Sequence, residues 1–370
     1  MARGWSPASA PASWHLTASL FRVIAAHEDL LLRLTRLADD RLPALLASAA
    51  VVFLVRRDRP QPLAGYFPEQ PRLDGGFCPA ATSFISGRLD DIAAECARRR
   101  YQMNEVARCA QIALGVTAAA DSRHEPIALA DIGTGAGFGL RLDRYHYVVG
   151  SRSSARRDAV LTLRCDVRGA CEPPQLALPP IAERTGIDIA PVDLQDHAAR
   201  SWLLACAPPE ASALTRLAAA IEVSRRHPAE ILAGEVIRVL PDVLDRFAPG
   251  RSVMVTETYL AVFLAPERRA ELTRIMADAG QARPVTWLSL DPLVPLGPSG
   301  RDSVQGLELP AQLVTDYQQH GVFAVLGVRT FHRGTDSGRL LARAHPSGQW
   351  IEWLEPLLGP AEPNSSETPS

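Results

Sequence analysis

The chain from Ile127 to Leu140 reads I-A-L-A-D-I-G-T-G-A-G-F-G-L, and the fold is inferred outward from this segment. Its first four residues form a short apolar run, which is typical of a buried parallel strand. Glycines follow at alternate positions. Gly133, Gly135 and Gly137 can take positive φ and carry no Cβ. The pattern predicts a strand that runs into a tight glycine loop, where a ligand can approach the backbone closely.

The spacing of these glycines excludes two common nucleotide-binding loops. A dinucleotide-binding loop requires G-x-G-x-x-G, but Phe138 or Leu140 stands where the third glycine would be. A P-loop requires a lysine after its last glycine, and all 39 basic residues of this chain are arginines. What remains is an acid, Asp131, followed by G-x-G-x-G.

This pattern resembles the first motif of class I S-adenosylmethionine-dependent methyltransferases. The resemblance implies that Asp131, Gly133, Gly135 and Gly137 bind the cofactor, with the acid near its methionine end. The alternative is a tight turn that holds no ligand.

The composition is that of an ordinary globular protein. The 370 residues suffice for one large domain or two unequal ones, and 47% are hydrophobic and 22% charged. A net charge of −2 favours neither nucleic acid nor an anionic membrane as a partner. The lack of lysine removes Schiff-base chemistry from the possible mechanisms.

Cysteine spacing and apolar run length indicate a cytoplasmic protein with reduced thiols. The six cysteines contain no C-x-x-C pair, which argues against a zinc ribbon, a redox motif or a disulfide scaffold, and no metal site is expected. The N-terminus has no apolar stretch of the signal-peptide kind. The apolar run at residues 43–55 is shorter than the roughly 20 residues that span a membrane, so it predicts a buried helix.

A helical segment is expected before the sheet, over residues 13–120. Residues 1–12 and the tail at 357–370 are expected to be disordered.

Within the helical segment, residues 90–118 predict one long helix. The helix would place Tyr101, Asn104, Glu105 and Arg108 on one face, because they stand at i, i+3, i+4 and i+7. A solvated face with an ion pair is the simpler interpretation. The sharper hypothesis is a lid over the cofactor loop, with Glu105 as a catalytic candidate and the other three in contact with substrate.

Four stretches resemble an uncharacterised bacterial family, known as domain of unknown function 2332. They are Y-Q-M-N-E-V-A-R-C, A-D-I-G-T-G-A-G, G-I-D-I-A-P-V-D and the late H-P-S-G-Q-W-I-E-W. The resemblance covers roughly residues 15–356. It implies a shared fold and supplies no activity.

Two strands after the glycine loop, at residues 145–149 and 160–167, predict a hairpin inserted within residues 145–180. Residues 185–191 then predict the second strand of the methyltransferase-like unit. The resemblance implies that Asp188, at its end, binds the ribose hydroxyls of the cofactor. Asp193 or Asp196 could serve instead.

Acids also close the next two predicted strands. Glu235 follows the third, in the place where the superfamily often has an acid near the adenine, and a surface acid is the alternative. The fourth strand, at residues 251–259, ends in T-E-T-Y, and ligands of open α/β sheets lie at such carboxyl ends. Glu257 is therefore the first candidate for a general base, with Thr256 and Tyr259 as substrate contacts. Capping of the following helix is the alternative for Glu257.

We therefore expect an α/β domain at residues 121–356, with a mostly parallel, Rossmann-like, seven-stranded sheet and helices on both faces. The resemblance implies the strand order 3-2-1-4-5-7-6. The expected function is transfer of a methyl group from S-adenosylmethionine to a small molecule, mainly by alignment of the reactants. The alternatives are a nucleotide- or S-adenosylmethionine-binding protein without catalysis and, less favoured, a nicotinamide oxidoreductase. The acceptor, the atom methylated and the oligomeric state stay open.

Overall fold

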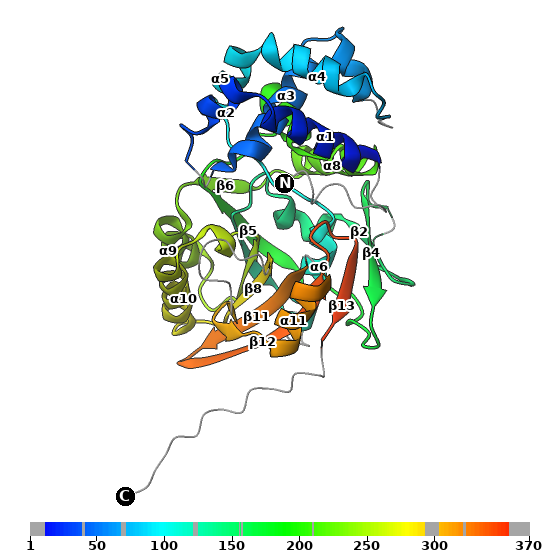
Figure 1. Ribbon diagram of the computed structural model, residues 1–370. Coiled ribbons are helices and arrows are strands. Elements are labelled where there is room, and N and C mark those ends of the chain that lie inside the picture. Colours follow the sequence, from blue (N-terminus) through cyan, green and yellow to red (C-terminus); the bar gives the residue numbers. More distant parts are fainter. Residues whose placement is uncertain are drawn as a thin grey trace, which may run out of the picture. The chain divides into compact units, whose positions relative to one another are not determined.

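A computed structural model describes residues 12–38, 41–67, 72–120, 125–154, 156, 158–208, 211–292, 303–320 and 323–354 (Figure 1). The chain divides into two compact units. A helical unit comprises Met1–Glu105 and Val192–Arg225, and a sheet unit comprises Val106–Pro191 and Arg226–Ser370. This division differs from the single boundary expected near residue 120, because a helical segment is inserted into the sheet unit. The disorder expected at both termini lies outside the described residues, except that Ala12 begins the first helix.

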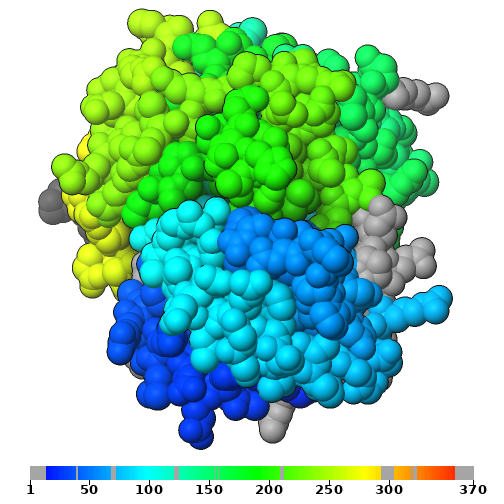
Figure 2. Space-filling model, turned by 90° about the horizontal axis from the view of Figure 1, so that it is seen from above, coloured from blue at the N-terminus to red at the C-terminus, as the bar shows by residue number. Residues whose placement is uncertain are grey.

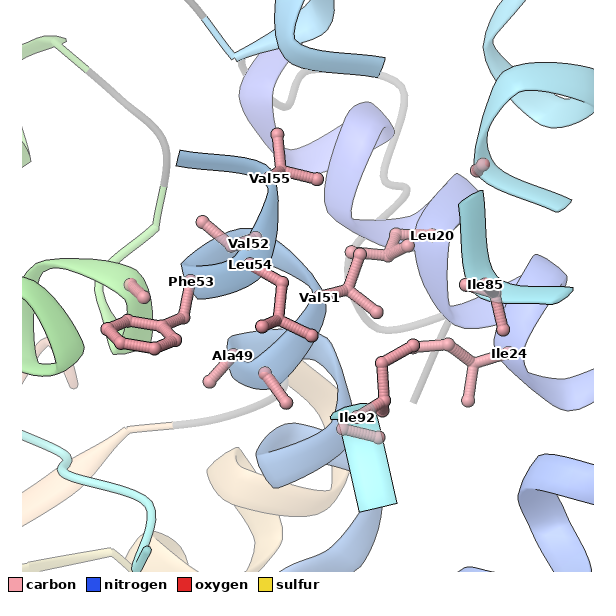
Figure 3. Close-up of a cluster of buried hydrophobic side chains, with 14 of the residues drawn as sticks. Leu20, Ile24, Ala49, Val51, Val52, Phe53, Leu54, Val55, Ile85 and Ile92 are labelled. Carbon is pink, nitrogen blue, oxygen red and sulfur yellow. The ribbon is translucent and has the colours of Figure 1, made fainter. Parts of the chain in front are cut away.

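The helical unit packs short helices around one apolar core. Its helices are α1 (Ala12–Ala25), α2 (Glu28–Leu34), α3 (Pro43–Arg57), η3 (Pro62–Tyr66), α4 (Phe77–Ser86), α5 (Leu89–Arg98), α7 (His197–Cys206) and α8 (Ala211–Arg226). The core is centred on α3, which is buried at nine positions, and this confirms the buried helix predicted at residues 43–55. Figure 3 shows Val51 and Leu54 of α3 beside Leu20, Ile24 and Ile92. In Figure 2 the described residues of this unit before residue 105 are blue to cyan, and residues 192–225 are green.

Helices α5 and α6 (Arg108–Ala119) are separate, so the single helix predicted at residues 90–118 is wrong. Side chains from elsewhere in the helical unit take the carbonyl groups at the end of α5. Arg41 donates to the carbonyl oxygen of Cys96 at 3.0 Å, and the indole N–H of Trp202 donates to that of Arg100 at 2.8 Å. A continuing helix would need these acceptors for its own N–H groups, so the tertiary bonds end it.

Eleven strands within the described ranges form one mixed sheet, in the order β3-β2-β4-β13-β12-β11-β8-β7-β1-β5-β6. Their bounds are β1 (Ile127–Ile132), β2 (His146–Val149), β3 (Arg152–Ser153), β4 (Thr162–Arg168), β5 (Ile181–Asp188), β6 (Glu230–Ala233), β7 (Val253–Thr258), β8 (Val285–Pro292), β11 (Ala324–His332), β12 (Thr335–Ala344) and β13 (Trp350–Trp353). A separate two-stranded sheet pairs β9 (Ser303–Val304) with β10 (Leu307–Glu308). The other helices of this unit are η4 (Phe138–Arg144), α9 (Val236–Arg246), η5 (Ala261–Phe263), α10 (Pro266–Gly280) and α11 (Ala311–His320).

The five strands β6-β5-β1-β7-β8 are parallel and follow the expected order 3-2-1-4-5. The last two positions are reversed relative to the prediction. β11 pairs antiparallel with β8, and β12 lies beyond it. Arg333 and Gly334 both have positive φ and form the tight turn between β11 and β12. This turn makes the two strands neighbours but does not determine which of them pairs with β8. The number of strands also differs, because β13, β4, β2 and β3 extend the sheet past the expected seven.

The hairpin predicted within residues 145–180 is wrong, although its strands form. β2 and β4 run parallel, with His146 opposite Thr162. Only the two-residue β3 turns back antiparallel to β2. β4 then pairs with β13, which comes from the far end of the chain.

Helices cover both faces of the central strands. β1 is buried at all six positions, as a strand covered on both sides must be. α9 and α10, which lie side by side in Figure 1, pack apolar side chains such as Leu240 and Met276 on one face. α6 packs on the other face, where a Cβ on Gly115 would lie 2.7 Å from a methyl carbon of Leu288.

Candidate functional site

The glycine loop after β1 is a turn built from left-handed glycines. Gly133, Gly135 and Gly137 have φ of 69°, 57° and 73°, which confirms the predicted positive values. Much of its N–H capacity is used internally. Gly133 donates to the Ile187 carbonyl at 2.8 Å, and Gly137 donates to that of Thr134 at 2.8 Å. The short 3₁₀ helix η4 follows directly, in place of the long helix whose N-terminus holds a phosphate elsewhere.

Asp188 ends β5, the neighbour of β1, and contacts the loop directly. Its Oδ2 accepts the N–H of Gly135 at 2.8 Å, and its Oδ1 accepts that of Ala190 at 2.8 Å. The two alternative acids are engaged elsewhere. Asp193 accepts a backbone N–H two residues on, and Asp196 caps α7. The structure therefore brings Asp188 to the glycine loop.

Asp131 joins the loop to β7. It is 7% exposed and accepts hydrogen bonds from the hydroxyls of Thr134 and Thr256, the latter at 2.9 Å. Burial raises the pKa of Asp131 to about 6, while the two threonine hydroxyls oppose that shift. A Cβ on Gly139 would lie 2.5 Å from its Oδ2, which explains the glycine there. Asp131 thus holds the loop in place through contacts that need no ligand.

The T-E-T-Y end of β7 lies beside the loop, as predicted, because Asp131 pairs in register with Thr256. Glu257 is fully buried, and its Oε2 accepts the N–H groups of Leu260 at 3.0 Å and Ala261 at 3.4 Å. Glu257 therefore caps η5. This is the capping role left open by the sequence, although the helix it caps is η5 and not the one that begins at Pro266.

Tyr259 and Arg108 meet just past the end of β7. Tyr259 has φ of 64°, a left-handed value that is rare for an aromatic residue. The guanidinium of Arg108 lies 4.0 Å from the centre of its ring. The Nε of Arg108 donates to the carbonyl of Pro346 at 2.6 Å. Through α6, Arg108 thus reaches the carboxyl end of β7.

The shared helical face predicted for Tyr101, Asn104, Glu105 and Arg108 is wrong, because the helix is interrupted between α5 and α6. The first three belong to the helical unit. The hydroxyl of Tyr101 donates to the carbonyl of Cys206 at 2.8 Å, and Asn104 contacts the side chain two residues before it. Glu105 forms an ion pair with α8 at 3.1 Å.

Glu235 follows β6 and occupies the N-cap position of α9. Its carboxylate pairs with Arg268 of α10. The preceding residue, Gly234, donates its N–H to the carbonyl of Asp188 at 2.9 Å. Glu235 is therefore close to Asp188 along the edge of the sheet, with 38% of its side chain exposed.

Three further residues shape this edge and were not found from the sequence. Leu260 lies against the loop, since a Cβ on Gly133 would be 3.1 Å from it. Ile189 is 61% exposed directly after Asp188. Arg141 donates to the Gly137 carbonyl. Ile189 and Leu260 follow predicted acid-bearing strand ends, which is a usable signal, whereas no pattern marks Arg141.

The loop lies at the switch point of the central parallel strands, because β5 and β6 lie on one side of β1, and β7 and β8, which come later in the chain, lie on the other. In the part of the chain that the structure describes, no group of three or more His, Cys, Asp or Glu residues could hold a metal ion. No helix there is long and apolar enough to cross a membrane.

Fold and site together define an α/β protein with a glycine turn at the switch point of a mixed sheet. The chain belongs to the family described as "Uncharacterized protein conserved in bacteria (DUF2332)", whose model matches residues 6–353. No curated protein matches it.

Solved structures of WbdD resemble parts of the chain at low scores. The structure titled as the bifunctional kinase-methyltransferase WbdD is 13% identical, with a TM-score of 0.24 over 49% of this chain and 28% of that one. The complex of WbdD with the kinase inhibitor LY294002 is 11% identical, with a TM-score of 0.28 over 64% of this chain and 45% of that one. The chain thus spans less than half the length of these WbdD chains, and TM-scores of this size carry no argument about fold or activity.

Proposed function

We propose that the sheet unit binds S-adenosylmethionine at the glycine loop and transfers its methyl group to a small molecule. The observation that carries the proposal is the bond between Asp188 and the N–H of Gly135, at the ends of two adjacent parallel strands. It joins the acid expected at the ribose to the loop expected at the cofactor. Asp188 is partly exposed and keeps acceptor capacity on both oxygens, which suits two neighbouring ribose hydroxyls.

The chemistry of the loop also favours this cofactor over a dinucleotide. Oxygen acceptors dominate the site, since Asp131 and Asp188 flank the loop and at least four loop N–H groups already have protein acceptors. The guanidinium of Arg141 donates to the Gly137 carbonyl. An amino group, a sulfonium and hydroxyls fit such a site, whereas a pyrophosphate would find few donors. The same facts weigh against a nicotinamide oxidoreductase.

In this proposal, catalysis rests on alignment of the acceptor with the methyl donor. We keep Glu257 as the proposed general base, although its Oε2 already accepts the N–H groups at the start of η5. An acceptor that already carries a nucleophilic lone pair would need no base.

A second candidate is a binding protein without methyl transfer. Leu260 lies against Gly133, and the next two glycines of the loop, Gly135 and Gly137, are buried. Glu257 caps a turn. These features all suit a closed structural turn. The two candidates differ in whether product forms.

Product formation separates them. The protein is incubated with S-adenosylmethionine that carries a labelled methyl group and a protein-free small-molecule extract of bacterial cells. The proposal expects labelled product and the demethylated cofactor from wild type, and their loss in Asp188→Ala. Asp193→Ala is the matched control and should retain activity, because among the described residues the Asp193 carboxylate bonds only a local N–H. Binding of the cofactor without any product would favour the second candidate.

A further inference from the structure

Arg108 is a buried cation whose contacts leave part of its guanidinium uncommitted. Its side chain lies at the start of α6, and the residue is 7% exposed. Buried arginines are ordinarily paired with a carboxylate, because removing a charge from water is costly. Within the described ranges, Arg108 has no carboxylate partner. Its contacts are the Pro346 carbonyl, through Nε, and the face of the Tyr259 ring.

The hydroxyl of Tyr259 is a second donor, carried by the ring that the guanidinium of Arg108 covers. Its Oη is buried and makes no hydrogen bond to any residue that the structure describes. Burial raises the pKa of Tyr259 to about 12, with the buried Asp291 adding to the shift and Arg108 opposing it, so the phenol keeps its proton at neutral pH and can donate it in a hydrogen bond. The backbone is held at φ 64°, with its N–H bonded to the Leu290 carbonyl at 3.0 Å. Strained backbone of this kind is concentrated at functional sites.

The turn at residues 345–348 holds the guanidinium in place. Gln111, one turn along α6, donates its amide N–H₂ group to the carbonyls of His345 at 3.1 Å and Trp350 at 2.9 Å. Gly348 packs so closely on Ala107 that a Cβ would lie 2.3 Å from its carbonyl carbon. The Pro346 acceptor is therefore fixed relative to α6, and so is the Nε of Arg108 that donates to it.

We propose that Arg108 and Tyr259 form an oxyanion subsite, which binds a carboxylate or phosphate group of the methyl acceptor. A guanidinium presents paired N–H groups that match either anion. The subsite lies on the β7 side of the glycine loop, because Tyr259 precedes Leu260, which touches Gly133. Asp188 lies on the β5 side. Naming the ligand an acceptor rests on the proposed function, whereas the oxyanion subsite does not.

Inorganic phosphate is the first probe, titrated at constant ionic strength and followed by phosphorus NMR. Wild type should show saturable binding. Arg108→Gln should weaken it at least about tenfold, and Tyr259→Phe about threefold or more. The matched control is Arg168→Gln, since Arg168 also stacks on an aromatic ring, at 4.4 Å from the centre of Trp350, but is solvent-exposed. Tyr259→Phe keeps Arg108 and the ring, so the test stands even if Arg108→Gln does not fold.

Two results would overturn the subsite: wild type that shows no saturable binding, or equal binding by all four proteins. A parallel titration with S-adenosylmethionine separates the acceptor from the cofactor. Unchanged cofactor affinity in Arg108→Gln supports the acceptor. An equal loss of cofactor affinity would overturn that assignment, because the oxyanion would then be the carboxylate of the cofactor. Wild type that binds phosphate but not the cofactor would leave the subsite standing and remove the proposed function.

Discussion

Asp131 is a carboxyl group whose surroundings oppose its charge. It is buried, its pKa is raised to about 6, and the negative charge of Asp188 adds to the effect of burial. The hydroxyls of Thr134 and Thr256 recover part of the cost by donating to it. At neutral pH the residue is ionised, so the loop carries a destabilising charge beside the expected position of a cationic cofactor. A positive ligand would offset that charge.

Replacement of Asp131 by Asn should make the free energy of unfolding less sensitive to pH. The folded pKa lies above the unfolded value near 4, so the contribution of this group to stability is complete below about pH 4 and is lost as pH rises through about 6. The shift corresponds to about 3 kcal/mol as an order of magnitude. In urea unfolding, the free energy of unfolding should therefore fall less between pH 4 and pH 7 for Asp131→Asn than for wild type. Equal drops in both proteins would contradict the assigned shift.

Gly137 is required both for its left-handed backbone and for the lack of space for a Cβ. Two variants separate these effects. Its φ is 73°, and a Cβ would lie 2.8 Å from a methyl carbon of Ile231 and 2.9 Å from Nη1 of Arg141. Gly250 has φ of 74° with nothing within 4 Å, so Gly250→Ala reports backbone strain alone. We expect a loss of about 1–2 kcal/mol of unfolding free energy for Gly250→Ala, and about 1–3 kcal/mol more for Gly137→Ala. Similar urea midpoints for the two would show that the loop is less crowded than described.

At the scale of elements, the break between α5 and α6 depends on Arg41. Its guanidinium donates to the carbonyls of Cys96, Ala97 and Arg99, which are the last acceptors of α5. We expect Arg41→Met to cost about 1–3 kcal/mol, because these groups lose a charged donor at a helix C-terminus.

The control for that variant is Arg33→Met. Arg33 pairs with Asp90 on the surface, where the side chains are 38% and 91% exposed, so its loss should cost under about 0.5 kcal/mol. Urea unfolding followed by far-ultraviolet circular dichroism measures both. Arg41→Met with the midpoint of Arg33→Met would remove the capping role.

Elements with strong local patterns could be predicted, and their partners could not. The strands β1, β5, β6, β7 and β8 are marked by apolar runs that end in acids or glycines, and their order follows the resemblance. β2 and β4 were also located, but not their parallel pairing with each other, nor the pairing of β4 with β13 from the far end of the chain. The end of α5 is set by Arg41 and Trp202, since residues 99–105 contain neither proline nor glycine.

The candidate site was predictable to a similar degree. The positive φ of the loop glycines follows from their lack of a Cβ, and Asp188 was named through the resemblance. The roles of Glu257 and Leu260 depend on the direction of a side chain at a strand end, which a one-residue change of register reverses. Arg108 was selected from a helical face that does not exist, and α6 nevertheless brings it to Tyr259.

At the scale of the whole molecule, the sheet gathers the site from distant parts of the sequence. The loop after β1, the end of β5 and the end of β7 meet because β1 lies between β5 and β7. The extra strands β13, β4, β2 and β3 extend the opposite side of the sheet, beyond β12. The topology therefore leaves the expected cofactor edge intact while it enlarges the sheet elsewhere.

Calorimetric titration with S-adenosylmethionine is the most direct test of cofactor binding at this edge. Wild type should bind with micromolar affinity. Asp188→Ala should bind at least about tenfold more weakly, because it removes the acceptor for the ribose hydroxyls, and Asp193→Ala should match wild type. Folded wild type that binds no cofactor at millimolar concentration, or Asp188→Ala with undiminished affinity, would contradict a cofactor site at the glycine loop.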